Sequence, residues 1–422
     1  MAAIFRASFA RRGDLARAAV EETGIGVLEH KVIKNRLVTR KTQGTEVLTP
    51  QAVTGDDGLT LTEYAPYGVI GAITPTTNPT STIICNTIAM LSAGNTIVFN
   101  VHPNARGCSM ENIRLLHRAI IRGGGPANLV TAVAEPTIES AQELMTHEGV
   151  RLLTVTGGPG VVRQAMRSGK RAVCAGPGNP PVVVDETADL PHAARNIVAG
   201  AGFDNNIVCT DEKEVFAVES IIDELLRHMG RYGAYLLTDG ELKRVEDAVF
   251  TEQRGPRKHA VVNKDLIGKN ASVILDRLAI SSGDDVRLVV VEVGVDHPLL
   301  WTELALARLD ADQPAEARQA MDAAIATGSA TASASRSCWC ISRSSSEVFV
   351  LKCITMIRSQ FSPQYLSNVG LWQAIAELDA LGALVPGELG PGEGDDVLLG
   401  QVAPRRRDDE RRHELAPLLV GD

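Results

Sequence analysis

The chain has 422 residues, which is enough for two or three domains, and an ordinary composition with 44% hydrophobic and 22% charged residues. Its formal net charge of −9 argues against a general nucleic-acid or acidic-membrane binder, because such proteins need a basic excess to release counterions. No apolar stretch approaches the roughly 20 residues that span a bilayer, and the N-terminus lacks the layout of a signal peptide. We therefore expect a cytoplasmic protein.

The seven cysteines are scattered and odd in number, so they cannot form a complete disulfide framework. Only Cys338 and Cys340 lie close together, and no second pair completes a zinc site. We expect no bound metal.

Helix and strand patterns alternate over the first 160 residues. The predicted elements are a helix at 14–39, a strand, turn and second strand within 59–75, a helix at about 80–92, a strand at 94–100, a helix at 108–124, a strand at 127–133, a helix at 137–147, and a strand that breaks into glycines at 150–160. Strands that alternate with helices of this length predict βαβ units and a parallel sheet covered on both faces.

A second α/β segment starts near residue 182. Its clearest predicted elements are a strand at 213–218, a helix at 219–237 and a strand at 285–293. After about 325 the sequence becomes small and polar without a period. We therefore divide the chain into a dinucleotide-binding domain (1–181), a partial catalytic domain (182–325) and a divergent tail (326–422). We expect most of 326–345 and 386–422 to be irregular.

Cys209 lies in an unusual setting, AGFDNNIVCTDEKEV. A small buried packing residue is the usual fate of a cysteine. Here a loop-like Asp-Asn-Asn precedes Cys209 and charged residues follow it, which favours partial exposure. A nucleophile presented from a loop is the alternative that this pattern supports.

Five motifs occur in an order that is similar to the aldehyde dehydrogenase superfamily, and most similar to its CoA-acylating branch of ethanolamine and propanediol utilisation. They are ITPTTNP (73–79), GNTIVFN (94–100), VTGGPG (155–160), AGPGNPP (175–181) and FDNNIVC (203–209). The resemblance covers roughly residues 14–325. It implies a dinucleotide-binding α/β domain and a second α/β catalytic domain, with the active site between them.

The resemblance implies that Cys209 is the nucleophile. Its thiolate would attack the aldehyde carbon, and loss of hydride would leave a thioester. Asn78 precedes Pro79 and could merely begin a turn. In the family, the matching asparagine points its amide N–H at the carbonyl oxygen, beside the backbone N–H of the cysteine.

The resemblance also implies the contacts with a nicotinamide cofactor, NAD with NADP as an alternative. Thr74, Pro75 and Thr76 would lie along the cofactor by their backbone. Gly157 and Gly158 precede a helix whose N-terminus favours phosphate, although an ordinary strand–helix turn would look the same.

Three further residues are implied as cofactor contacts. Asn100 stands where many relatives have a lysine that holds the adenosine ribose. His102 is a candidate on the adenosine side, with surface packing as the alternative. Glu303 matches the acidic residue that holds the nicotinamide ribose, although it could also be a solvated carboxylate at a helix end.

The residue at position 175, an alanine, distinguishes hydrolytic from CoA-acylating enzymes of this family. Hydrolytic relatives carry a glutamate about 34 residues before their cysteine, and this glutamate activates water against the thioester. Counting 34 back from Cys209 reaches Ala175, which cannot take a proton. Coenzyme A thus becomes the expected co-substrate, and a short-chain aldehyde, NAD and CoA would give acyl-CoA and NADH.

Two alternatives remain: a hydrolytic NAD(P)-dependent enzyme, or an inactive truncated or frameshifted homologue. The second arises because ATGSATASASRSCWC replaces the Gly/His-rich region that the family has after residue 325. The resemblance further implies a homo-oligomer with no nucleic-acid or membrane partner. For the family, the lumen of a bacterial microcompartment is an alternative location, but no targeting extension is seen here.

Overall fold

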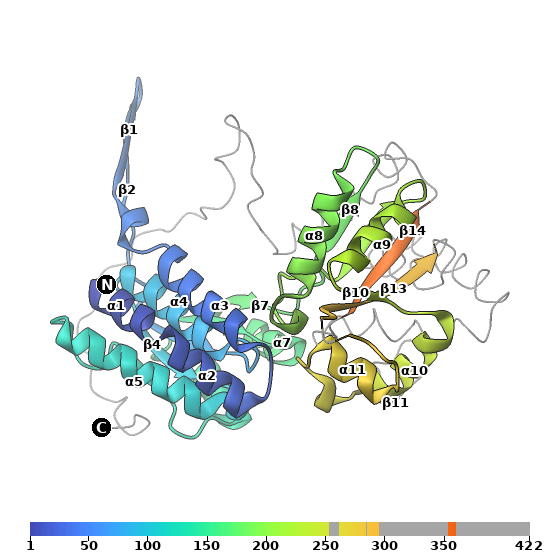
Figure 1. Ribbon diagram of the computed structural model, residues 1–422. Helices are drawn as coiled ribbons and strands as arrows, with labels where there is room; N and C mark the ends of the chain where they lie inside the picture. The colour runs from blue at the N-terminus through green and yellow to red at the C-terminus, as the bar shows by residue number, and fades with distance from the viewer. Residues whose placement is uncertain (253–260, 284, 295–352, 360–422) are drawn as a thin grey trace.

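The chain forms two lobes, each built on one parallel sheet (Figure 1). The computed structural model describes residues 1–252, 261–283, 285–294 and 353–359. Glu303, which is expected to contact the cofactor, therefore lies outside the described residues, as do the stretches 326–345 and 386–422. The α/β fold class expected from the sequence is confirmed.

The sheet of the first lobe has five parallel strands in the order β5-β4-β3-β6-β7. Their bounds are β3 (Val69–Ile73), β4 (Thr96–Asn100), β5 (Val130–Ala132), β6 (Leu152–Thr156) and β7 (Arg171–Ala175). Counted from β3 in chain order, this is the 3-2-1-4-5 arrangement of a doubly wound dinucleotide-binding sheet. The order reverses between β3 and β6, and such folds bind their ligands at the carboxyl ends of the strands at this point.

Helices cover both faces of this sheet. Their bounds are α1 (Ala2–Ala10), α2 (Arg12–Thr23), α3 (Leu28–Lys41), α4 (Pro79–Ser92), α5 (Arg106–Arg122), α6 (Ile138–Thr146) and α7 (Pro159–Arg167). The apolar sides of α1, α2, α4 and α5 pack on one face around the fully buried Phe99, while α6 and α7 contribute Leu144, Met145 and Ala165 to a core on the other. Burial on both faces explains why the strands are almost continuously apolar.

The single helix predicted at 14–39 is wrong: the segment forms two helices, α2 and α3. Gly24 ends α2 with a φ of +65° and Gly26 follows at +83°, a left-handed conformation that glycine adopts without a steric penalty. The break turns α3 toward the second lobe. The start of α3 therefore contacts the second lobe, where Val27 N donates a hydrogen bond to Asp204.

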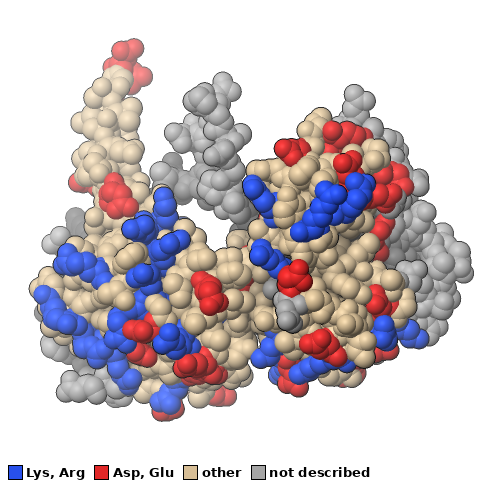
Figure 2. All heavy atoms as spheres, in the orientation of Figure 1, with Lys and Arg blue, Asp and Glu red and all other residues tan. Residues whose placement is uncertain are grey.

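A hairpin of β1 (Gln51–Gly55) and β2 (Gly58–Thr62) projects from the first lobe (Figure 1). Its side chains are mostly exposed, including the apolar Val53, Leu59 and Leu61. Figure 2 shows charged atoms at its tip and base and none between. The strand expected after residue 58 therefore pairs with a segment before it, and only β3 joins the main sheet.

The second lobe has a parallel sheet in the order β10-β13-β14-β9-β8. The strands are β8 (Pro181–Val184), β9 (Glu214–Val218), β10 (Ala234–Leu236), β13 (Leu288–Gly294) and β14 (Cys353–Ser359). The helices are α8 (Leu190–Ala201), α9 (Ile222–Arg231), α10 (Asp239–Val249) and α11 (Ala271–Arg277), and a small antiparallel pair joins β11 (Phe250–Glu252) to β12 (Val261–Val262). The last strand of the first sheet ends at Ala175, and the first strand of the second begins at Pro181.

One feature of this lobe differs from the sequence prediction, and a second was not predicted. The segment 219–237 is not one helix, because Gly233 (φ +96°) separates α9 from the short strand β10. In addition, β14 comes from the tail and lies between β13 and β9, paired in parallel with both. Its sequence, CITMIRS, is rich in the β-branched and apolar residues that strands favour.

Candidate active site

Cys209 follows a left-handed turn at the end of α8. Asp204, Asn205 and Asn206, in the short 3-10 turn η3 (Phe203–Asn206), have φ values of +44°, +59° and +62°. Asn and Asp tolerate this region better than other residues with a Cβ. All three are at most 1% exposed, whereas Cys209 itself is half-buried. The motif FDNN is therefore a rigid, buried turn that presents the thiol at its end.

The two asparagine amides hold this turn on both flanks. Asn205 donates from Nδ2 to Gly268 O at 2.7 Å and to Asn270 Oδ1 at 3.0 Å. Asn206 donates from Nδ2 to Ala201 O at 2.7 Å, at the end of α8, and to Glu212 O at 3.0 Å. Buried amides with fixed partners specify one backbone arrangement before Cys209.

The peptide group before Cys209 is held by a buried lysine. Lys213 donates from Nζ to Val208 O and to Asn206 O, both at 3.1 Å, while Val208 N–H donates to Asp211 Oδ2 at 3.2 Å. In a trans peptide the N–H points opposite to the C=O. The backbone N–H of Cys209 is therefore directed away from Lys213.

Two of the charged residues that follow Cys209, Asp211 and Lys213, are buried. Each is 7% exposed. Burial raises the pKa of the Asp211 carboxyl and lowers the pKa of the Lys213 amine, and the opposite charge of each partner works against both shifts. The pair can be buried because each group also bonds to the backbone around Cys209.

Burial raises the pKa of the Cys209 thiol above its ordinary value. The positive charges of Lys213 and Lys34 oppose this effect, and the negative charge of Asp211 adds to it. The resting group is therefore a thiol at neutral pH. A proton must leave before Cys209 can act as a nucleophile.

A cluster of buried charges joins the two lobes beside this turn. Asp204 accepts hydrogen bonds from Val27 N at 2.7 Å, from Lys31 Nζ at 3.3 Å and from Lys34 Nζ. The Asp204 N–H donates to His30 Nδ1 at 2.8 Å. Asp204, Lys31 and Lys34 are only 0%, 2% and 8% exposed. One carboxylate of the second lobe thus anchors the start of α3 to the nucleophile turn.

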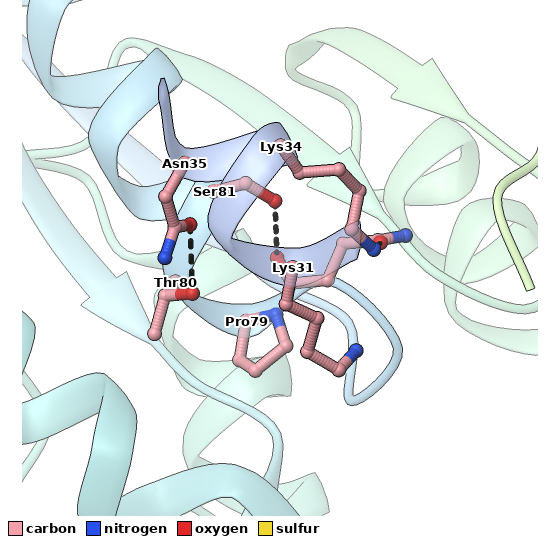
Figure 3. Close-up of a pocket in the computed structure, with 7 residues that line it drawn as sticks. Lys31, Lys34, Asn35, Pro79, Thr80 and Ser81 are labelled. Carbon is pink, nitrogen blue, oxygen red and sulfur yellow. Dashed lines mark hydrogen bonds between the residues drawn. The ribbon is translucent and has the colours of Figure 1, made fainter. Parts of the chain in front are cut away.

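Asn78 belongs to the same cluster. It is the half-buried N-cap residue of α4; its Oδ1 accepts a hydrogen bond from Lys34 Nζ, and its Nδ2 donates to Thr77 Oγ1 at 3.2 Å. A shallow surface depression lies here. Figure 3 shows Lys31 and Lys34 extending from one helix beside Pro79, Thr80 and Ser81. Through Lys34, the structure brings Asn78 close to the turn that carries Cys209.

The segment between the two sheets passes directly against Cys209. A Cβ atom on Gly178 would lie 2.3 Å from Cys209 O, and Lys213 N–H donates to Pro180 O at 3.0 Å. Ala175 ends β7 three residues before Gly178, so the two can be at most about 11 Å apart. Ala175 therefore begins the segment that leads to the contact with Cys209.

The residues expected to hold a dinucleotide meet at the carboxyl ends of β3 and β6. Thr74 N–H donates to Asn100 O at 3.3 Å, and Gly157 N–H donates to Ala175 O at 3.1 Å. The hydroxyl oxygens of Thr74 and Thr76 are buried without a hydrogen-bond partner in the described structure. Gly158 caps the N-terminus of α7, and nothing lies within 4 Å of where its Cβ would be. Open space at a helix N-terminus beside unpartnered hydroxyls fits a phosphate-bearing ligand.

Asn100 and His102 lie at the end of the neighbouring strand. The Asn100 side chain is 4% exposed and bonds to Thr137 O at 3.4 Å and Ser140 Oγ at 2.9 Å, so it is used inside the lobe. His102 is half-buried, and its Nδ1 accepts from Asn104 N at 3.1 Å. Burial lowers the pKa of His102, which keeps the ring neutral. A side-chain contact with a cofactor is thus better supported for His102 than for Asn100.

The sequence reasoning missed Lys34, Asp204, Lys213 and Gly178 as parts of the site. Lys31 and Lys34 are three residues apart on a helix, a spacing that is equally typical of a solvated face. Asp204 is the one charged residue in the five sequence motifs, and this was the only sequence signal that could have singled it out. In the described parts of the chain, no group of three or more His, Cys, Asp or Glu residues could hold a metal ion, and no helix is long and apolar enough to cross a membrane.

Comparison with known proteins gives a consistent result. The model of the aldehyde dehydrogenase family matches residues 7–247. Acetaldehyde dehydrogenase (acetylating) EutE of Salmonella typhimurium is 44% identical over 313 residues, which are 74% of this chain and 67% of that protein. The chain belongs to the aldehyde dehydrogenase family.

Comparison with solved structures supports membership of the same family. A propionaldehyde dehydrogenase from the fucose utilisation microcompartment of Clostridium phytofermentans matches with a TM-score of 0.69 and 38% identity, covering 85% of this chain and 71% of that one. Propionaldehyde dehydrogenase of Rhodopseudomonas palustris, with bound CoA and an acylated cysteine, matches with a TM-score of 0.64 and 45% identity over 68% of this chain and 66% of that one. The resemblance drawn from the five sequence motifs is thereby confirmed.

Proposed function

We propose that the protein is a CoA-acylating aldehyde dehydrogenase that converts a short-chain aldehyde, NAD and CoA to acyl-CoA and NADH. The observation that carries this proposal is the position of the segment AGPGNPP. It passes against Cys209 at Gly178, and it has an alanine and no carboxylate where a hydrolytic enzyme needs its base. The acetylating and CoA-bound relatives support the same assignment.

In the proposed mechanism, Cys209 loses its proton and attacks the carbonyl carbon of the aldehyde. The oxyanion that forms is bound by the amide N–H of Asn78 and the backbone N–H of Cys209, and one such donor is typically worth about 2.7–4 kcal/mol. Loss of hydride from this adduct leaves a thioester on Cys209. The thiol of CoA then releases its proton to solvent and attacks the thioester carbon; the bond from that carbon to the CoA sulfur forms, its bond to the Cys209 sulfur breaks, and Cys209 departs as the thiolate.

NAD, when bound, supplies the acceptor for the hydride. We assign its phosphates to the space at Gly157 and Gly158, and its neighbouring parts to the backbone at Thr74, Pro75 and Thr76. The neutral ring of His102 is a candidate on the adenosine side, and Asn100 would act there by its backbone alone. The assignment of Glu303 to the nicotinamide ribose stays a prediction, as does the choice of NAD over NADP.

Two further properties belong to the same proposal. The exposed apolar side chains of the β1–β2 hairpin favour a homo-oligomer in which this surface is covered. A location in the cytoplasm or in a microcompartment lumen is consistent with the relative from a fucose utilisation microcompartment. We assign no nucleic-acid or membrane partner.

The test is the dependence of NADH formation on CoA. With aldehyde and NAD alone, the protein should give at most one NADH per active site, and adding CoA should start continuous turnover. Cys209→Ala should abolish both phases, whereas Cys174→Ala, a change of another half-buried thiol, should abolish neither.

Continuous NADH formation with release of carboxylic acid and without CoA would favour the hydrolytic alternative. Ala175→Glu is the matched gain-of-function variant, because it restores a base at the expected place and should increase that CoA-independent activity. Absence of any Cys209-dependent NADH would instead favour the inactive homologue.

A further inference from the structure

Lys34 connects the two parts of the proposed oxyanion site. Its Nζ bonds to Asn78 Oδ1 and to Asp204 Oδ2, and the residue is 8% exposed. Asn78 begins α4 in the first lobe, while Asp204 lies five residues before Cys209 in the second. An ammonium group has three donors, so one group can serve both acceptors.

This contact decides which way the Asn78 amide points. A lysine can only donate a hydrogen bond, so it must face the oxygen of the amide and not its nitrogen. The amide nitrogen carries two hydrogens, of which one is directed to Thr77 Oγ1. The second is left for a ligand. A residue with both donor and acceptor atoms at position 34 would permit the amide to flip.

We propose that Lys34 is a positioning residue, which holds the Asn78 amide with its N–H toward the substrate oxygen and ties that amide to the Cys209 turn through Asp204. The proposal deepens the function proposed above and rests on its assignment of Cys209 and Asn78. Lys31 cannot replace Lys34 in this role, because its Nζ bonds to Thr77 O at 2.9 Å and to Asp204, not to the Asn78 side chain.

The test compares two reactions of Cys209 that need neither NAD nor CoA. p-Nitrophenyl acetate acylates the thiolate: the S–C bond forms, the C–O bond breaks, and nitrophenolate leaves, with an oxyanion in the intermediate. Iodoacetamide alkylates the same thiolate by displacing iodide from a saturated carbon, without an oxyanion. The ratio of the two rate constants therefore isolates oxyanion binding from the supply of thiolate.

The central variant is Lys34→Met, which keeps the apolar stem and leaves Asp204 paired with Lys31. We expect the ratio of acylation to alkylation to fall about 10-fold or more, up to the 10²–10³ that loss of one oxyanion donor costs. Asn78→Ala should give the full loss. Adding Lys34→Met to Asn78→Ala should lower the ratio no further, because the lysine acts through that amide.

Controls define the background and the specificity. Cys209→Ala gives the rate of both reactions at other cysteines. Lys170→Met is the matched lysine change and should leave the ratio unchanged. Lys170 Nζ bonds to Val150 O at 2.9 Å at the amino ends of β6 and β7, away from the carboxyl ends of the strands. Lys34→Arg keeps a donor and a cation at Asp204 and should lower the ratio less than Lys34→Met.

An unchanged ratio in Lys34→Met, or an effect that multiplies with that of Asn78→Ala, would overturn the proposal. If Lys34→Met fails to fold, the same cycle with Lys34→Arg decides the question, because coupling to Asn78 is the quantity measured. A wild-type protein that shows no Cys209-dependent acylation would overturn the proposal together with the site. Failure to reduce NAD would count only against the proposed function, since neither reaction uses NAD.

Discussion

The two lobes use parallel sheets of five strands in different ways. All strands of the first sheet come from the continuous segment Val69–Ala175, and its carboxyl edge carries glycines and two buried hydroxyls without partners. The second sheet has β14, from residues 353–359, between β13 and β9. Around the turn before Cys209, this lobe carries buried charges that bond to the backbone and to lysines of α3 in the first lobe.

This difference indicates two kinds of preorganisation. The first lobe offers space and unpaired donors, so a ligand completes it. The second lobe positions Cys209 through its own side chains and through contacts with α3 of the first lobe. Changes in the second lobe or at the junction should therefore affect chemistry more than binding of NAD.

The largest effect should come from removing β14. A chain ending at residue 352 would divide the second sheet into the pairs β10-β13 and β9-β8, and two-stranded pieces are marginal by themselves. We expect limited proteolysis to digest the second lobe of this chain and to spare residues 1–175. A chain ending at residue 359 is the matched control and should keep both lobes resistant. Equal resistance of the second lobe in the two chains would show that β14 contributes nothing to it.

The next largest effect concerns the charges at the junction. Asp204→Asn keeps the size of the side chain and the tolerance of a left-handed φ, but it leaves Lys31 and Lys34 buried without their carboxylate. Removing one partner of a buried ion pair typically costs about 3–5 kcal/mol in the free energy of unfolding. Denaturant titration should measure this loss.

Asp14→Asn is the control for that measurement. It removes the exposed pair of Asp14 with Arg11, which should be worth about 0–1 kcal/mol. If Asp204→Asn were as mild as this control, the two lysines would not depend on Asp204, and the junction would be held by other contacts.

A smaller and more local effect should follow from Gly178→Ala. The added Cβ would meet Cys209 O at 2.3 Å, so the backbone of the nucleophile must shift. A misplacement of about 1 Å can cost about 10²-fold in rate, and we expect a loss of that order in acyl-CoA formation. Binding of NAD, measured by calorimetry, should stay unchanged. Gly176→Ala, two residues earlier, has nothing within 4 Å of the new atom and should retain activity.

The sequence was sufficient to predict the parts of this fold that depend on local pattern. Alternation of helices and strands predicted the parallel sheet of the first lobe. Because such a sheet brings the carboxyl ends of neighbouring strands together, Thr74 after β3 and Gly157 after β6 lie at one edge. Cys209 and Asn78 were found in the same way, from motifs, and their catalytic roles stay predictions.

The contacts that join the lobes could not be predicted. Lys34 and Asp204 are 170 residues apart, and the burial of each depends on the other. The burial of Lys213 could not be foreseen either, because a charge is normally solvated unless a partner is known. Similarly, the pairing of β14 with β13 and β9 depends on which sheet edges the rest of the chain leaves open.

The smallest expected effect is on the ionisation of Cys209, and it tests how strongly the second lobe prepares its nucleophile without a ligand. Because burial raises the pKa of this thiol above its ordinary value, the thiolate fraction should still increase with pH in mildly alkaline solution. The rate of Cys209 alkylation by iodoacetamide, corrected with Cys209→Ala, should therefore rise through pH 9 without a plateau. Lys213→Met removes a positive charge that opposes the shift, so it should raise the pKa further and slow alkylation at pH 8. Lys41→Met, a change of an exposed lysine, should not alter the rate.

A rate that levels off near pH 7 in the wild type would mean that the resting protein already holds a thiolate. The second lobe would then activate Cys209 more than its burial implies.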